Sequence, residues 1–288
     1  MIRTLVLAAG LLVCQSASAQ NAPPPALPLT IENVAPDVYV VRGEGGNTTV
    51  LVSDEGVLLV DVKFERNFDD LVAKIKSVTD KPVKYIINSH SHGDHTGGNQ
   101  KFLGSSATII AHRNARAAMV TGKQPGPPQI TYTDQFGLQL GGKDVVARYF
   151  GRAHTDGDTW VFLPAQRIIV TGDSFNTADG RGLNPTKSVT YAFFIAPGGS
   201  FQEVTATLDA VLKEDFDIAI PGHGPVAKKA DVLRWRNDIE TLRGRVTTMV
   251  REGKSTAEVH KMLVAEFGWD PTLDPMRRIQ PLLDQVRR

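Results

Sequence analysis

The segment that most constrains this chain is 90–95 (HSHGDH), which places three imidazoles and a carboxylate within six residues. It directly follows the apolar run 83–87, which is typical of a buried strand. Such a segment packs poorly in a core, whereas neutral imidazoles and carboxylates are ligands of zinc and similar divalent ions. Across an extended turn, the first two histidines point one way and the last two polar residues another, so one segment can supply two neighbouring ions. The sequence therefore predicts a metal site at the end of a buried strand.

The order of elements around this segment occurs twice in the chain. The first half predicts strands at 38–42 and 48–61, the latter split by a turn at 54–56, then a helix with one apolar face and the strand 83–87. The helix rests on the spacing of Phe68, Leu71, Ile75 and Val78. The second half predicts strands at 159–163 and 167–171, a helix at 201–213 and a strand at 217–220.

Aligned by element, Asp61 corresponds to Asp173 and His90 to His223. This pattern predicts two similar halves, each a sheet with helices outside, packed sheet to sheet so that the loops after their strands meet along one edge. The alternative is that any α/β protein repeats strands and helices.

The first nineteen residues have the order of a secretory signal. Arg3 supplies the positive charge, 5–13 the apolar core and 17–19 (ASA) the small-residue cleavage site. The apolar stretch is too short to span a bilayer. The alternative to a secretory signal is a buried N-terminal helix. We expect cleavage after Ala19 and location in the periplasm or outside the cell, with no stable membrane anchor. The only cysteine, Cys14, would be removed with the signal, leaving no disulfide or thiolate ligand.

The expected domain plan is a signal peptide at 1–19, an extended leader at 20–37, a main domain at 38–230 and a helical extension at 231–288. Helices are expected at 231–250, 255–267 and 276–286, covering one sheet. In the first of these, Leu233, Asn237, Leu242 and Val246 make no clean apolar stripe, which indicates a half-exposed helix.

The charge balance argues against nucleic acid as a partner. Lysine and arginine total 32 against 31 acidic residues, and no long run of like charge occurs. We therefore expect a small-molecule substrate.

Three more candidate ligands lie in turns that contain glycine at strand ends: His154, Asp173 and His223. Glycine allows the backbone to approach a ligand closely. Each residue alone is more typical of a surface or a cap, but together with 90–95 they favour a metal centre.

With these residues in view, the chain resembles the metallo-β-lactamase superfamily of hydrolases over about 38–225. The resemblance rests on His90-x-His92-x-Asp94-His95 followed by His154, Asp173 and His223. It implies an α/β fold, a four-layer αββα sandwich, here with C-terminal helices. It also implies two Zn²⁺ ions per chain, the first bound by His90, His92 and His154 and the second by Asp94, His95 and His223. Asp173 would bridge both ions, and Asp61 would brace the histidine loop from outside the ligand set.

The same resemblance implies the mechanism. A hydroxide bridging the two ions attacks a carbonyl, because divalent ions lower the pKa of water from about 15.7 to roughly 7. Asp94 would orient the hydroxide and carry a proton to the leaving atom. No G-x-S-x-G nucleophile motif is present.

Departures from each subfamily shape the expected substrate. Lactamases with a cysteine ligand carry that cysteine where Asp173 stands and an arginine where His95 stands. A second lactamase subclass shares the 90–95 pattern but usually has serine in place of Asp173. The full set resembles glyoxalase II, lactonases and related hydrolases more closely, whereas export favours β-lactams. We expect an exported di-zinc hydrolase with β-lactam hydrolysis favoured, and a lactonase, esterase or thioesterase as the alternative.

Other classes on the same fold are disfavoured. A non-catalytic binding module would lack a ligand, a di-iron redox enzyme normally has a flavin domain and an extra acidic ligand, and a nuclease would carry a clamp domain. The sequence leaves open the native substrate, the leaving group, the metal in the cell and the oligomeric state.

Several further residues carry weaker signals. His112 is expected to be a cap or surface residue, and His260 a packing or surface residue. The segment 121–129 is either a connection or a flap. Asn184 and Lys187 could reach a substrate carboxylate or be solvated, and 193–195 could line a pocket wall or pack under a loop.

Overall fold

The computed structural model describes residues 28–105, 107–177, 198–272 and 274–287. The expected signal peptide and the expectations for Asn184, Lys187 and 193–195 fall outside these residues.

The first sheet has seven strands in chain order. They are β1 (Thr30–Ala35), β2 (Val38–Arg42), β3 (Thr48–Ser53), β4 (Gly56–Val60), β5 (Val83–Asn88), β6 (Thr108–His112) and β7 (Ile130–Tyr132). β1 to β4 form an antiparallel meander, and β4 to β7 are parallel. Because β1 pairs with β2, the sheet begins inside the segment expected to be a leader, at Thr30 rather than Val38.

The second sheet has six strands, in the order β13-β12-β11-β10-β9-β8. They are β8 (Gln135–Leu140), β9 (Lys143–Arg148), β10 (Trp160–Leu163), β11 (Ile168–Val170), β12 (Ile218–Ile220) and β13 (Ala227–Lys228). Only β11 and β12 are parallel, as β4 and β5 are in the first sheet. The two halves therefore share a hairpin followed by a parallel crossover.

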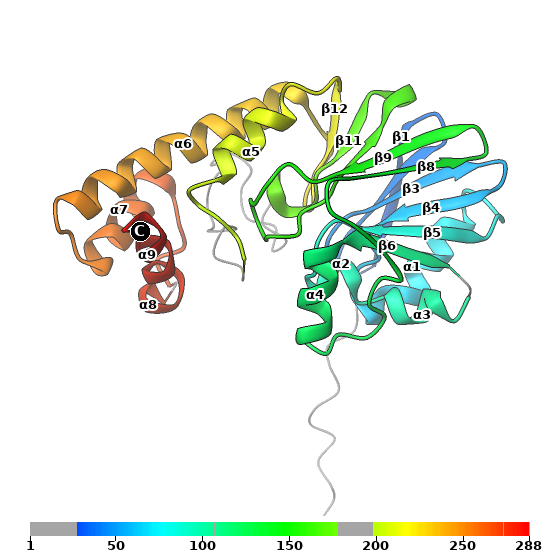
Figure 1. Cartoon of the computed structure of the whole chain (residues 1–288), viewed down its shortest axis with the longest axis horizontal. Coiled ribbons are helices and arrows are strands. Elements are labelled where there is room, and N and C mark those ends of the chain that lie inside the picture. Colours follow the sequence, from blue (N-terminus) through cyan, green and yellow to red (C-terminus); the bar gives the residue numbers. More distant parts are fainter. Residues whose placement is uncertain (1–27, 106, 178–197, 273, 288) are drawn as a thin grey trace, which may run out of the picture.

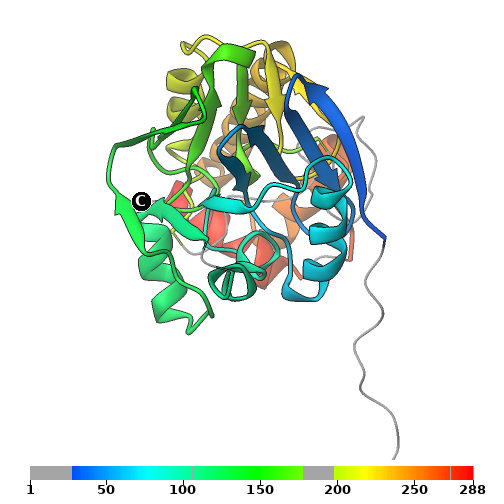
Figure 2. The same ribbon diagram turned by 90° about the vertical axis from the view of Figure 1, so that its right-hand side faces the viewer.

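Four layers result from alternation along the strands (Figures 1 and 2). In β4, Leu58 and Val60 join the core between the sheets, whereas Val57 and Leu59 face the outer core with α1. The outer helices on that side are η1 (Glu65–Asn67), α1 (Phe68–Lys76), α2 (Gly93–Thr96), α3 (Asn99–Leu103) and α4 (Arg113–Thr121). The expected αββα sandwich is confirmed.

The other outer layer begins with α5 (Val204–Val211) and α6 (Lys229–Arg251). Figure 1 shows α6 running away from the sheets, with the last helices at its far end. These are α7 (Thr256–Phe267), α8 (Pro275–Arg278) and α9 (Gln280–Val286); short 3-10 turns η2 (Pro164–Gln166) and η3 (Gly172–Ser174) complete the described elements. The last helices share one apolar core with α5 and β10, so they extend that core rather than cover the sheet as expected.

The expected lack of an apolar stripe in α6 is wrong. Val232, Trp235, Ile239, Leu242 and Val246 are all buried and recur every three or four residues. The expectation used Leu233, which is 48% exposed, and so started one residue out of phase. The last helix is also divided at Ile279, where Pro281 lacks the amide needed to continue one helix.

The correspondence between the halves is confirmed for His90 and His223 but wrong for Asp61 and Asp173. Asp61 N donates to Ile87 O at 3.0 Å, and Thr171 N donates to Ile220 O at the same distance. Since Ile87 and Ile220 end equivalent strand pairs, the structural counterpart of Asp61 is Thr171. The counterpart of Asp173, two residues further on, is Lys63.

Within the described part of the chain, no helix is both long and apolar enough to cross a bilayer.

Candidate metal centre

The 90–95 segment leaves the first sheet at the end of β5, as expected, and turns into α2. His90 is 1% exposed and His95 is fully buried. α2 is only four residues long and starts after His92, so the segment changes direction between His92 and Asp94. This turn separates its polar side chains into two groups.

The seven candidate ligands converge from both sheets. Ligand atoms lie within 4.8 Å of one another in one group of His90, His92, His154 and Asp173, and in another of Asp94, His95 and His223. A third such group joins Asp61 with His90 and His95. Residues from five separate loops thus meet at the shared edge of the two sheets.

Asp173 lies between the two groups, and its two oxygens face different histidines. Oδ2 is 3.5 Å from His154 Nε2 and 4.0 Å from His90 Nε2. Oδ1 is 3.2 Å from His95 Nε2 and 3.3 Å from His223 Nε2. Oδ1 is also among the few buried side-chain oxygens in the described residues that have no hydrogen-bond partner. A buried carboxylate oxygen without a hydrogen bond is costly, unless a cation binds it.

The imidazole nitrogens point at each other. His92 Nδ1 is 3.1 Å from His90 Nε2 and 2.9 Å from His154 Nε2, while His95 Nε2 is 3.4 Å from His223 Nε2. A single proton can form a hydrogen bond between two imidazole nitrogens. His92 Nδ1 faces two imidazoles, so one proton cannot bond it to both. Divalent cations accept all these lone pairs together with the carboxylates, so the residues present fit a metal centre of nitrogen and oxygen ligands.

Asp61 fixes two of the histidines from behind. Its carboxylate accepts bonds from Ser89 N at 2.7 Å and Ser89 Oγ at 2.6 Å, and lies 2.7 Å from His95 Nδ1. Ser89 Oγ is in turn 2.9 Å from His90 Nδ1. With these outer nitrogens protonated, the Nε2 lone pairs of His90 and His95 point into the site. Ser89 was missed from the sequence alone. A serine beside a histidine gives no signal until its hydrogen-bond partner, here Asp61 after the neighbouring strand β4, is known.

Asp158, also missed, organises the loop that carries His154. Its buried carboxylate accepts bonds from Thr155 N at 3.0 Å, Thr155 Oγ1 at 2.5 Å and Ser174 Oγ at 2.9 Å. Burial raises the pKa of Asp158 to about 6, against the effect of these bonds. Asp158 therefore ties the His154 loop to the residue after Asp173. The only sequence signal was a carboxylate inside a turn.

The charges of the metal-free site are strongly coupled. Burial opposes ionisation of Asp94, but the charges of His95 and His223 lower its pKa to about 2. Burial likewise disfavours charged His223, yet the Asp173 and Asp94 carboxylates raise its pKa to about 9. Burial and the neighbouring His95 and His92 hold the pKa of His90 well below its usual value. The carboxylates are thus ionised at neutral pH, as cation binding requires.

The remaining histidines lie outside both groups. His112 caps α4, as expected, by accepting a bond from Asn114 N, but it is buried and stacks on Tyr149 rather than lying at the surface. His260 on α7 lies 3.3 Å from Asp270 O and is part-buried.

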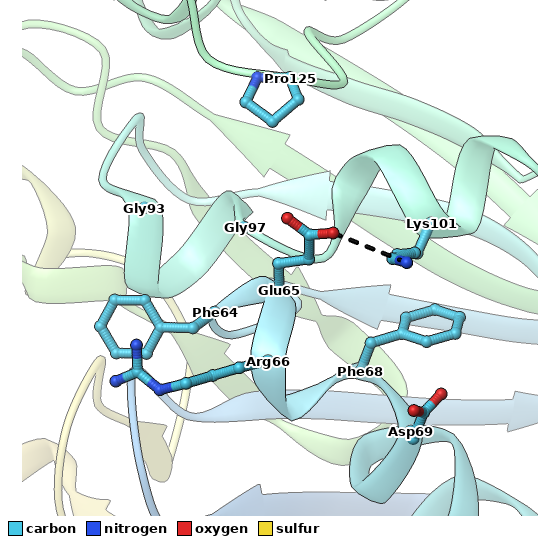
Figure 3. A pocket seen from close by; sticks show the side chains of 9 residues that line it. All are labelled: Phe64, Glu65, Arg66, Phe68, Asp69, Gly93, Gly97, Lys101 and Pro125. Carbon is cyan, nitrogen blue, oxygen red and sulfur yellow. Dashed lines mark ion pairs between the residues drawn. The ribbon is translucent and has the colours of Figure 1, made fainter. Parts of the chain in front are cut away.

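A hollow of about 560 Å³ adjoins the metal-binding loop at Gly93 (Figure 3). The Arg66 guanidinium lies 4.3 Å from the centre of the Phe64 ring, and Lys101 pairs with Glu65 at 3.6 Å. Pro125, from the segment 121–129, also lines it, and Asn99 Nδ2 donates to Gly126 O at 3.0 Å, so this segment is tied to α3.

The chain is similar to known proteins in both sequence and fold. Residues 41–223 match the family model described as "Metallo-beta-lactamase superfamily". The chain is 26% identical over 194 residues to "Metallo-beta-lactamase type 2" of Bacillus sp. (strain 170), covering 65% of this chain and 70% of that protein. It is 24% identical over 206 residues to "2,4-dinitroanisole O-demethylase subunit alpha" of Nocardioides sp. (strain JS1661), covering 68% and 57%. Its fold is similar to that of a metallo-beta-lactamase from Pontibacter korlensis, with a TM-score of 0.63 at 17% identity, over 74% of this chain and 99% of the other.

Proposed function

Because the chain belongs to the metallo-beta-lactamase superfamily and is a metal-dependent hydrolase, we propose that it binds two zinc ions and opens a carbonyl-containing bond, with β-lactams as its favoured substrates. The observation that carries the proposal is Asp173. Its two oxygens face two separate groups of histidines, and one of them is buried without a hydrogen bond.

The proposed ligands follow the two groups. His90, His92 and His154 would hold the first ion, Asp94, His95 and His223 would hold the second, and Asp173 would contribute to both. Asp61 stays outside the ligand set, because its oxygens already bind Ser89 and His95. Its role is to hold the imidazoles in one orientation.

When bound, the ions supply a nucleophilic water of lowered pKa and polarise the scissile carbonyl. The chain's own residues supply position and proton transfer. The side chain of Asp94 is 24% exposed, so a substrate can reach it, and its Oδ2 lies 3.2 Å from His223 Nε2. A carboxylate at the accessible side of the site can receive a proton and pass it to the leaving atom, which is the role proposed for Asp94.

The proposed place for the body of the substrate is the hollow beside Gly93, a residue that lies between His92 and Asp94 in the sequence. Its volume of about 560 Å³ falls within the range of ligand pockets, which is roughly 300 to 1,000 Å³. Phe64 lines the hollow with the Arg66 guanidinium over one face of its ring, and Arg66 also pairs with Glu44.

The alternative is hydrolysis of a lactone, ester or thioester with little lactamase activity. The bridging aspartate favours this alternative, because the resemblance in that position is to glyoxalase II and lactonases. Export favours β-lactams, since they act outside the cytoplasm. Export itself is proposed from the order of charge, apolar core and small residues in 1–19.

Substrate class is tested by a panel of β-lactams, lactones and thioesters with the zinc-loaded protein. We expect β-lactam hydrolysis that a chelator abolishes and zinc restores. Hydrolysis of lactones or thioesters with β-lactams untouched would establish the alternative, and no hydrolysis of any class would contradict both. N-terminal sequencing of the exported protein should give Gln20, and an intact Met1 would contradict export.

A further inference from the structure

Lys63 is a buried cation beside the metal centre that the proposed reaction does not use. It follows β4 and has no exposed surface. Its Nζ donates to Gly46 O at 2.7 Å and to Glu44 O at 3.3 Å. Its φ of 59° lies in the left-handed region that favours glycine, so backbone preference does not explain a lysine here.

The carbonyls that Lys63 binds belong to the tight segment 43–47, which joins β2 to β3. Gly46 lies directly against the second group of candidate ligands. Gly46 N donates to Asp94 O at 3.0 Å, and a Cβ on Gly46 would lie 2.2 Å from His95 Cε1. The segment therefore sets the position of the Asp94 backbone and of the His95 ring.

The next residue, Asn47, connects the same segment to the other half of the protein. Asn47 N donates to Gly222 O at 2.7 Å, and Asn47 Nδ2 donates to Pro221 O and Gly224 O, each at 2.9 Å. These carbonyls flank His223 on both sides. One segment thus contacts the loops of all three proposed ligands of the second ion.

The first group is held by different contacts. Ser89 binds the outer nitrogen of His90, and Asp158 organises the turn after His154. Asp61 is shared, because it supports His90 through Ser89 and His95 directly. The contacts of Lys63 and of the 43–47 segment, in contrast, lead to the second group.

We propose that Lys63 is a positioning residue for the second metal ion, acting through its hydrogen bonds to the 43–47 segment. This inference rests on the proposed two-ion centre. The ammonium draws the Glu44 and Gly46 carbonyls inward, which keeps Gly46 against His95 and Asn47 on the 221–224 turn. Burial lowers the pKa of Lys63 to about 8, and the charges of Asp94 and Asp61 oppose this effect, so the ammonium form predominates at pH 7. Without it, the ligands of the second ion lose their fixed separation, while those of the first keep theirs.

The test is a titration of the metal-free full chain with Zn²⁺ against a chromogenic chelator, which gives a dissociation constant for each ion. Lys63→Met keeps an unbranched side chain, one atom shorter, and removes its donors. We expect the second constant to rise about 10- to 100-fold, as for other supports outside the ligand set, with the first constant within about twofold of wild type. The Co²⁺-loaded variant should keep the visible spectrum of its first equivalent and change that of its second.

Lys81→Met is the matched control, because the Lys81 ammonium also donates to a backbone carbonyl, Ser53 O at 2.7 Å, but its side chain is 38% exposed and lies at the opposite end of β4 from Asp61. It should bind both ions as wild type does. Asn47→Ala removes the next link and should reproduce the selective loss, so the inference remains testable if Lys63→Met does not fold.

Each outcome decides the inference. An unchanged second constant in Lys63→Met or Asn47→Ala overturns it, and so does equal weakening of both ions, which would indicate general loss of structure. A wild-type chain that binds one ion at saturation overturns the two-ion proposal as well. Two ions bound with wild-type dissociation constants in both variants overturn only the role of Lys63.

Discussion

At the scale of single residues, Asp173 has the most specific expected role. A carboxylate that faces both groups neutralises charge and fixes the spacing of two cations. Asp173→Ala should therefore reduce zinc affinity by more than the roughly 10- to 100-fold expected of a residue outside the ligand set. Asp173→Ser should keep part of the β-lactam hydrolysis, since six proposed ligands remain.

Zinc content and turnover of these variants, measured at equal metal supply, check this prediction. His112→Ala is the control, because His112 caps α4 and stacks on Tyr149 outside both groups. It should lose some stability but no zinc. Asp173→Ala with two ions and wild-type turnover would reduce Asp173 to a strand-end residue.

Asp61 provides a second residue-scale prediction. Both of its oxygens accept bonds, from Ser89 and from His95, so the amide of Asp61→Asn must place its NH₂ group against a donor. We expect about 10- to 100-fold weaker zinc binding. Ser89→Ala, which retains the Asp61 contact to His95, should lose less. Equal zinc affinity in Asp61→Asn and wild type would show that zinc binding does not require Asp61 to orient the imidazoles.

At the scale of elements, the phase of α6 is testable. Ile239 is fully buried in the core shared with α5 and α9, whereas Leu233 is 48% exposed. Ile239→Ala should lower the free energy of unfolding by about 2 to 5 kcal/mol, and Leu233→Ala by less than about 0.5 kcal/mol. Urea denaturation of the zinc-loaded variants measures both. Equal losses would place α6 outside the core.

Periodicity predicted most of the central elements, because β2 to β5 and β10 to β12 are apolar runs bounded by turns. Periodicity failed in α6, where two apolar residues adjacent in sequence, Val232 and Leu233, could each begin the apolar face of the helix. The stripe that includes Val232 and Trp235 was missed because the expectation started from the adjacent, exposed Leu233. The 90–95 segment indicated a metal site because no core can hold it. The roles of Ser89 and Lys63 depend on partners distant in sequence, and that of Asp158 depends on Ser174 as well as on the nearby Thr155. Pattern alone does not identify these partners.

At the scale of the whole molecule, metal-free stability should depend on pH. The folded pKa of His223 is raised to about 9, against about 6.5 for an unfolded histidine. A raised pKa gives stability that is complete below pH 6.5 and is lost as pH rises through about 9. We therefore expect the free energy of unfolding of the chelator-treated protein to fall over this range, as followed by urea denaturation.

The zinc-loaded protein should not show this fall, because its ligands are already deprotonated. Zinc binding near pH 7 should accordingly release protons into a weakly buffered solution, and zinc affinity should rise with pH up to about 9. A His223→Ala variant should release fewer protons. Proton release equal to that of wild type would show that His223 is not charged in the metal-free site.

The central claim is that two ions act together in one hydrolytic site. Seven candidate ligands are too many for one tetrahedral ion that must also leave a position for water. The most direct measurement is hydrolysis of a β-lactam as zinc is added stepwise to the metal-free chain, with the bound metal determined by elemental analysis at each step. The account predicts saturation at two ions per chain and a rate that keeps rising until the second ion is bound. Saturation at one ion with full hydrolysis would contradict it.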